Sequence, residues 1–225
     1  MFIGHFGLSF AAKKAAPKVS LATLFMATQF VDILWPFLLV FGIEKVAVTP
    51  GYTKLNAFEF LHYPYTHSLL MGLVWGAIVG GVHWLVKRDS RSALVIGFCV
   101  LSHWLLDVIV HVADLPITPF SEYKVGLGLW NHVAVTLIVE TAIFLGGVFV
   151  YTSVTRAKNK AGSWGLWTLV ALLLLLTVSN TFGPTPPDSV MILFYSFVLL
   201  MAIILSLSYW VDKNRELTST NKYFY

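Results

Sequence analysis

The stretch ALVIGFCVLSHWLLDVIVHV, residues 93–112, decides the class of fold. Apart from His103, Asp107 and His111, its side chains are apolar or small. A helix of about 20 such residues spans the hydrocarbon core of a bilayer. The stretch therefore predicts a transmembrane helix, and its three ionisable residues are the features that need an explanation.

The rest of the chain has the same character. Of its 225 residues, 57% are hydrophobic and only 12% are charged, about half the charged fraction of a soluble domain. Apolar runs predict six spans, at residues 19–41, 67–86, 93–112, 132–152, 164–181 and 190–211. We therefore expect an all-α polytopic membrane protein, a six-helix transmembrane bundle that forms a single integral membrane domain over residues 1–225. In the loop after the first span we expect one short helix, at residues 56–61.

The N-terminal segment, residues 1–16, is apolar but too short to cross a membrane. Lys13 and Lys14 follow its apolar run, whereas a secretory signal carries its charges before the run. A half-length segment at membrane depth is tolerated inside a protein bundle. The sequence therefore predicts a short re-entrant or interfacial helix at the N-terminus.

Basic residues are distributed unequally between the two sides of the predicted bundle. Twelve lysines and arginines fall on one side, whereas the other side holds only Lys45, Lys54 and Lys124. Because cytoplasmic segments are enriched in Lys and Arg, we expect both termini in the cytoplasm. The basic residues are then topology signals with lipid headgroups as neighbours, and nucleic acid is not an expected partner.

Ionisable side chains inside the predicted spans are costly in hydrocarbon and are functional candidates. His103, Asp107 and His111 follow one another at intervals of four residues, and Asp114 follows three residues later, so one helical face is expected to carry them. Other spans contribute Asp32 and Glu140. At about 1.5 Å per helical residue, these groups are expected in the middle and outer layers of the bundle.

The segment HYPYTHSLL, residues 62–70, adds two histidines where the second span begins. Pro64 fixes a turn between them, and Thr66 or Ser68 could cap the following helix. Imidazoles together with carboxylates suit zinc, manganese or iron. We expect one or two divalent ions, zinc first among them, in a site that opens outward. The expected ligands are His5, Asp32, His67, His103 and Asp107.

Three sequence elements resemble a YdjM-like family of inner-membrane metal-dependent hydrolases. They are His5 with Asp32, the Thr-His-Ser-Leu of residues 66–69, and the Ser-His-x-x-x-Asp of residues 102–107. That family is distantly similar to zinc-dependent phospholipase C and P1-type nucleases. The resemblance implies a phosphoester-type metal hydrolase in the cytoplasmic (inner) membrane. The family's turn carries an arginine where Tyr63 stands here, so phosphate binding is not expected at this position.

The expected reaction is hydrolysis of an ester or phosphoester by metal-activated water. His111, Glu140 and His62 are the expected general acid, general base or orienting groups. A lipid or lipid-linked molecule is the expected substrate class, because the site would open near the outer leaflet. The sequence lacks a Gly-x-Ser-x-Gly elbow and a P-loop, which disfavours a serine nucleophile.

Other functions remain open from the sequence. A proton- or ion-coupled transporter would use Asp32, Asp107 and the histidines as a relay, but usually shows internal repeats, which this chain lacks. A haem electron carrier would use histidine pairs and leave the aspartates unexplained. A histidine-box di-iron oxygenase would need more histidines. A single intramembrane histidine can also serve only as a structural hydrogen-bond partner.

Overall fold

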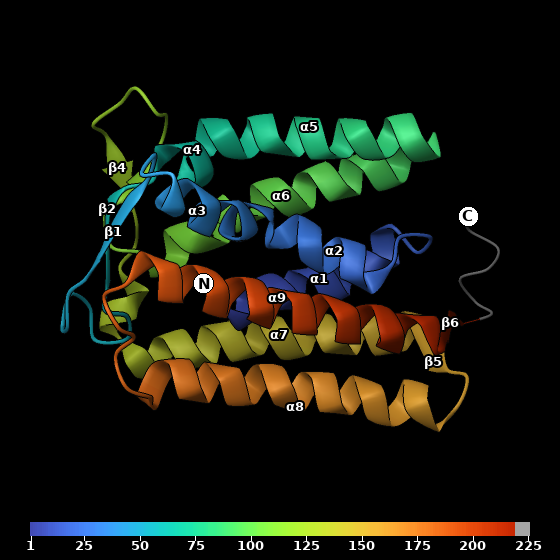
Figure 1. The fold of residues 1–225 in the computed structure, drawn as a ribbon. Helices are drawn as coiled ribbons and strands as arrows, with labels where there is room; N and C mark the ends of the chain where they lie inside the picture. Colours follow the sequence, from blue (N-terminus) through green and yellow to red (C-terminus); the bar gives the residue numbers. More distant parts are fainter. Residues whose placement is uncertain (219–225) are drawn as a thin grey trace.

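The protein is mostly helical in a computed structural model, in which residues 1–218 are described (Figure 1). The helices are α1 (Ile3–Ala15), α2 (Leu21–Thr28), α3 (Phe30–Val40), α4 (Pro64–His67), α5 (Leu69–Lys87), α6 (Ser90–Val110), α7 (Val133–Val154), α8 (Lys160–Phe182) and α9 (Val190–Lys213). Short antiparallel pairs join β1 (Lys45–Val48) to β2 (Phe58–His62), β3 (Leu115–Pro116) to β4 (Lys124–Val125), and β5 (Thr155–Ala157) to β6 (Arg215–Leu217).

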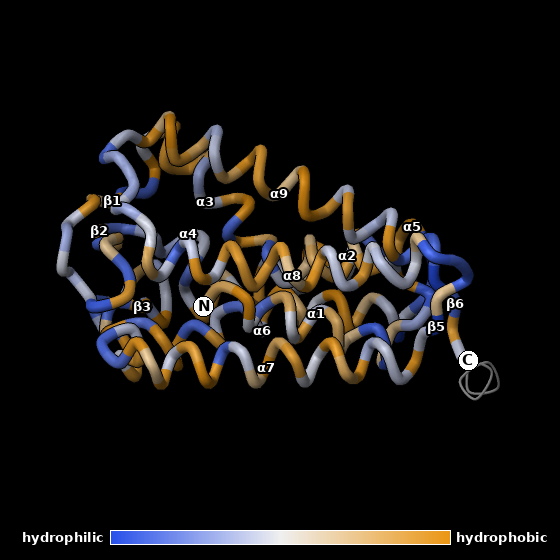
Figure 2. The backbone as a smooth tube through the Cα atoms, turned by 90° about the horizontal axis from the view of Figure 1, so that it is seen from below, coloured by the Kyte–Doolittle hydropathy of each residue, from blue (hydrophilic) through white to orange (hydrophobic). Residues whose placement is uncertain are grey.

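The membrane-spanning helices of the described chain match the predicted bundle. Five helices, α5 to α9, are each long and apolar enough to cross a membrane, and α2 with α3 makes a sixth if this bent pair is counted as one span. Hydrophilic residues gather at the two ends of the bundle, and hydrophobic residues cover the helices between them (Figure 2). Large apolar side chains such as Leu94, Phe149 and Leu175 are exposed there. This pattern is that of a protein whose outer surface faces lipid.

The first span is not the continuous helix that the sequence predicts for residues 19–41. It breaks at Gln29, and the axes of α2 and α3 differ by 53°. At the break, the backbone carbonyl of Thr28 accepts a hydrogen bond from the ring of His103 on α6. Pro36 further weakens α3, because it has no N–H to donate to the carbonyl of Asp32.

The short N-terminal helix is present as α1, and it lies inside the bundle between α7, α2 and α6 (Figure 1). Ile3, Phe6 and Phe10 are completely buried along it. Its backbone touches α7 directly, because a Cβ atom added to Gly147 would lie 1.9 Å from the carbonyl oxygen of Gly7. Glycine at both positions therefore lets a half-length helix pack at the centre of the bundle.

The loop after the first span forms a hairpin of β1 and β2, not the short helix that the sequence predicts at residues 56–61. The aromatic rings of Phe58 and Phe60 both pack on Trp35, with centroids 6.2 and 5.6 Å away. Residues two apart share a face only in an extended strand. Packing on Trp35 therefore overrides the helical expectation.

Opposite the hairpin end, a group of charged side chains joins α1, α2, α7 and α9. We call it the Lys13–Asp212 cluster; its members are Lys13, Tyr151, Asp212 and Arg215. Asp212 accepts hydrogen bonds from Lys13 Nζ (2.7 Å), the Tyr151 hydroxyl (2.8 Å) and the Leu21 amide (3.1 Å). Arg215 donates to the backbone oxygens of Thr155 and Gly162. These contacts close one end of the bundle.

Candidate metal centre

The five residues that the sequence selects as metal ligands lie together in the structure, although they come from four helices. Two groups of three have one ligand atom per residue within 4.8 Å of one another: His5, His103 and Asp107, and Asp32, His67 and His103. His103 belongs to both groups. We call these five residues the His–Asp cluster. Their roles as ligands remain a prediction.

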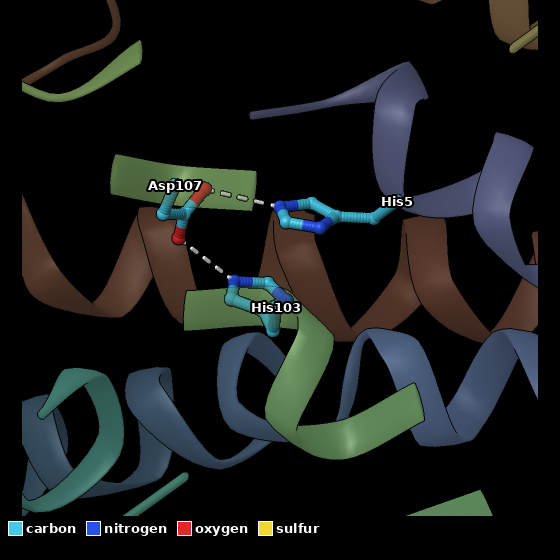
Figure 3. A group of neighbouring side chains, drawn as sticks. All are labelled: His5, His103 and Asp107. Atoms are coloured by element: carbon cyan, nitrogen blue, oxygen red, sulfur yellow. Dashed lines mark hydrogen bonds and ion pairs between the residues drawn. The ribbon is translucent and has the colours of Figure 1, made fainter. Parts of the chain in front are cut away.

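Asp107 lies at the centre of the cluster and uses its two oxygens differently (Figure 3). Oδ1 is 3.1 Å from His5 Nε2, and Oδ2 is 3.1 Å from His103 Nε2. The rings of His5 and His103 stack with their centroids 3.8 Å apart. Asp107 therefore contacts both histidines, one through each of its oxygens, and so connects the two sides of the cluster.

Asp32 forms the edge of the cluster. Its Oδ1 lies 3.2 Å from His67 Nε2 and 3.4 Å from His103 Nε2. The Asp32 side chain is 26% exposed, whereas that of Asp107 is 2% exposed. The break at Gln29 positions Asp32 in the first turn of α3, so the bent span determines where this carboxylate meets the two histidines.

The hydrogen bonds of His103 determine which ring nitrogen can bind a cation. Nδ1 lies 2.6 Å from the carbonyl oxygen of Thr28, which can only accept, so Nδ1 carries the hydrogen. Nε2 is buried and, within residues 1–218, has no hydrogen-bond partner, although oxygens of Asp32 and Asp107 lie nearby. A neutral imidazole would aim its lone pair at two carboxylates. Only a proton or a metal cation between them makes that arrangement stable.

A second set of contacts orients His67 from behind. Its Nδ1 lies 2.7 Å from the hydroxyl of Thr66, and that hydroxyl lies 2.7 Å from Glu44 Oε2. The other oxygen of Glu44 accepts the backbone N–H groups of Tyr65 and Thr66. If Thr66 donates to Glu44, it accepts from Nδ1 of His67 and leaves Nε2 free toward Asp32. Hydrogen bonding of this kind fixes the tautomer of metal-binding histidines.

Glu44 was not selected from the sequence, yet it is 1% exposed. Burial raises the pKa of its carboxyl group, and its hydrogen bonds from Thr66 and Tyr65 oppose the rise. It lies in a loop 23 residues before His67 along the chain, so no local spacing connects the two. Only the fold reveals the contact.

The three residues expected to act as acids or bases lie in different surroundings. Nε2 of His111 is 3.9 Å from Asp107 Oδ2, so His111 borders the cluster. Glu140 accepts the backbone N–H groups of Phe2 (2.8 Å) and Gly4 (3.4 Å), and so holds the N-terminal end of α1. His62 is exposed at the end of β2, and among the described residues the structure does not bring it into the cluster.

Two further features differ from the sequence expectation. The helix that carries His103 and Asp107 ends at Val110, so His111 and Asp114 do not continue one helical face. In addition, the amino group of Met1 forms an ion pair with Asp107, and this brings the start of α1 to the cluster.

Comparison with known proteins supports the membrane reading. A family model described as YdjM inner membrane protein matches residues 48–183, which is more than half of the chain. The chain belongs to this family. His67, His103 and Asp107 lie within the matched range, whereas His5 and Asp32 precede it. No match was found among curated proteins or among solved structures. Membership of the YdjM family and the apolar helices together identify an integral protein of the inner membrane.

Proposed function

We propose that this YdjM-family protein is a membrane-embedded metal-dependent hydrolase that cleaves an ester or phosphoester bond in a lipid or lipid-linked substrate. One observation carries the proposal. Nε2 of His103 and Nε2 of His67 both face the carboxylates of Asp32 and Asp107, with ligand atoms spaced as a metal ion requires. Nitrogen and carboxylate oxygen are the donors that zinc accepts in catalytic sites. We therefore expect zinc, with manganese or iron as alternatives.

The protein side chains would divide the work as follows. His5, His67, His103, Asp32 and Asp107 would hold one or two ions. A bound ion would supply an acidic water molecule and would polarise the bond to be broken. His111 is outside the ligand set and its Nε2 lies 3.9 Å from Asp107 Oδ2, and it would exchange protons with the reacting oxygen atoms. Glu140 would act indirectly, by holding the helix that carries His5.

The surroundings of the cluster favour a hydrolase over a proton- or ion-coupled transporter. A relay across the membrane needs a polar path that reaches both faces. Along α1 from the cluster, the side chains of Phe6, Phe10 and Phe25 are completely buried and pack on one another. The buried hydroxyls of Ser9 and Thr28 beside these rings bond to each other and to backbone carbonyls. This packing supports a site that takes its substrate from one side only. The exposed edge at Asp32 is the proposed side of entry.

The test begins with elemental analysis of the detergent-purified protein beside a His103→Ala/Asp107→Ala double variant. His83→Ala is the matched control, since it removes a histidine from α5 that lies outside the cluster. We expect near-stoichiometric zinc, manganese or iron in the wild type and the control, and none in the double variant. Phosphodiester and carboxylic-ester lipids in mixed micelles are then assayed, and hydrolysis should follow the metal content.

Two results would overturn the proposal. The first is hydrolysis that persists in the metal-free double variant. The second is the absence of metal from folded wild-type protein, also after incubation with zinc. In that case a proton between the histidines and the aspartates explains the geometry, and ion flux across liposomes becomes the next measurement.

A further inference from the structure

Asp114 lies just beyond the end of α6 and holds His111 in place beside the His–Asp cluster. Its Oδ1 is 3.0 Å from His111 Nδ1 and 3.0 Å from the hydroxyl of Tyr63. All three residues are buried, each with at most 5% of its surface exposed. Because the carboxylate accepts, His111 carries its hydrogen on Nδ1, and Nε2 remains free. That nitrogen is the one that lies 3.9 Å from Asp107 Oδ2.

The distance of 3.9 Å between His111 and Asp107 is informative. It is too long for a direct hydrogen bond. In this tautomer Nε2 carries no hydrogen, so it has nothing to donate to Asp107. A water molecule or a substrate oxygen beside Asp107 would lie within reach of the free nitrogen. His111 therefore faces the cluster as a proton acceptor.

Tyr63 completes the arrangement from the segment between β2 and α4. Burial, followed by the charge of Asp114, raises the pKa of the Tyr63 hydroxyl well above its usual value. The hydroxyl therefore remains a donor at neutral pH and supports Asp114 as an acceptor. The family resemblance gave an arginine at this position, so here a neutral donor contacts the carboxylate instead.

The glycine-containing loop of residues 125–128 supports the backbone on which His111 is carried. Gly128 donates its N–H to the carbonyl of His111 at 2.6 Å, and Leu127 donates to the carbonyl of Val108 at 2.8 Å. A Cβ atom on Gly126 would lie 1.9 Å from the carbonyl oxygen of Val112. Any other residue would push the loop away from the turn. This contact accounts for glycine at position 126.

We propose that Asp114 and Tyr63 are a positioning pair that fixes the tautomer and direction of His111, so that its Nε2 takes the proton of the attacking water. This inference rests on the proposed hydrolase function for the catalytic step. One O–H bond of water breaks and its proton moves to Nε2, while the oxygen bonds to the phosphorus or carbonyl carbon. The same proton then passes to the leaving alcohol oxygen as its bond breaks, which restores His111.

The arrangement resembles an aspartate that orients a catalytic histidine through Nδ1. If the hydrogen bond were purely structural, Asp114 would also be buried. The reaction would then not depend on which ring nitrogen of His111 carries the hydrogen. Asp114→Asn separates the two cases. Its amide can donate to Nδ1, and that would move the ring hydrogen to Nε2 while the shape of the side chain is kept.

The experiment is nitrogen NMR of the full-length protein in detergent micelles, labelled with nitrogen-15 histidine and kept in one metal state. The His111 signal is assigned by its loss in His111→Gln. We expect the Nδ1–H form in the wild type and in Asp188→Asn, a matched control on an exposed loop. We expect the Nε2–H form in Asp114→Asn. With a hydrolysed probe in hand, kcat should fall about 10²–10⁴-fold in Asp114→Asn, with KM nearly unchanged.

Failure of this inference is distinct from failure of the proposed function. An Nε2–H form in the wild type, or the same form in wild type and Asp114→Asn, overturns the positioning pair even if the protein hydrolyses lipids. The wild-type spectrum alone decides this if Asp114→Asn does not fold. If the tautomer shifts as expected, the result supports the positioning pair. If none of the probes is hydrolysed, that result counts only against the proposed reaction.

Discussion

Two buried polar groups lie near opposite ends of α1, and they differ in how their charges are balanced. In the Lys13–Asp212 cluster, donors meet acceptors: an ammonium, a phenol and a backbone amide all donate to one carboxylate. In the His–Asp cluster, the Met1 amino group pairs with Asp107, but Nε2 of His103 faces oxygens of both Asp32 and Asp107 without a hydrogen of its own. Both groups are costly to bury. The first is complete within the protein, whereas the second needs a proton or a metal ion at His103.

This difference separates a structural from a functional use of buried charge. A closed set of donors and acceptors can only stabilise the fold or hold helices in register. Where acceptors face acceptors, the rest of the structure holds them in place. Such a set is stabilised only when a proton or a metal ion binds between the acceptors. Variants that affect one group and leave the other intact test the distinction directly.

The largest effect is expected from Asp212→Ala. It leaves Lys13 buried without its carboxylate, and breaking such a pair costs about 3–5 kcal/mol in free energy of unfolding. The metal content of the protein that remains folded should be unchanged. Urea unfolding in detergent micelles, followed by tryptophan fluorescence, measures the first quantity, and elemental analysis measures the second.

The matched control is Glu216→Ala, which breaks an exposed pair with Arg156. Exposed pairs of this kind contribute between 0 and about 1 kcal/mol. If Asp212→Ala also abolished metal binding in folded protein, the two clusters would act as one unit and the comparison would fail.

An intermediate effect is expected from Gly147→Ala, which acts on the helix that joins the two groups. The added Cβ would lie 1.9 Å from the carbonyl oxygen of Gly7, so α1 must move away from α7. Overpacking of this kind costs about 1–3 kcal/mol. Because α1 carries His5, the affinity for zinc should fall as well, as measured by competition with a chelating dye.

Gly146→Ala is the control on the same turn of α7, because a Cβ there meets no atom within 4 Å. It should leave both stability and zinc affinity near wild type. A Gly147→Ala protein with unchanged zinc affinity would show that His5 is not needed to hold the ion.

The smallest effect concerns Asp89, a half-buried carboxylate at the start of α6. Hydrogen bonds from the hydroxyl and then the backbone N–H of Ser92 lower its pKa. Its pKa in the folded state is therefore below the unfolded value of about 3.9, so its contribution is present at neutral pH and is lost as the pH falls below about 4. Asp89→Asn should flatten this acid limb slightly in unfolding measurements at stepwise lower pH. A steeper limb in the variant would contradict this origin.

Much of the helical framework could be predicted from the sequence because long apolar runs have few alternatives in a membrane. The mostly helical fold, with five to six candidate spans and a short N-terminal helix, is confirmed. The sequence also selected His5, Asp32, His67, His103 and Asp107 as one group, because ionisable residues in the middle and outer layers of a small bundle are costly unless they find partners.

The remaining features depend on contacts between distant segments. The break at Gln29 goes with a hydrogen bond to α6, and the hairpin at Phe58 depends on packing against Trp35. Glu44 reaches Thr66 only after the hairpin has formed. The hydroxyl of Tyr63 is buried against Asp114, which lies 51 residues further along the chain. Composition and periodicity carry no information on such pairings.

The break at Gln29 has a mechanical consequence for the His–Asp cluster. The last residue of α2, Thr28, accepts the Nδ1 hydrogen of His103, and the carboxylate of Asp32 on α3 lies near Nε2 of the same ring. The ring of His103 thus contacts both α2 and α3, whose axes differ by 53°. Straightening the span would withdraw the carbonyl and the carboxylate together. A change in the angle of the bend would therefore alter both contacts of His103 at once.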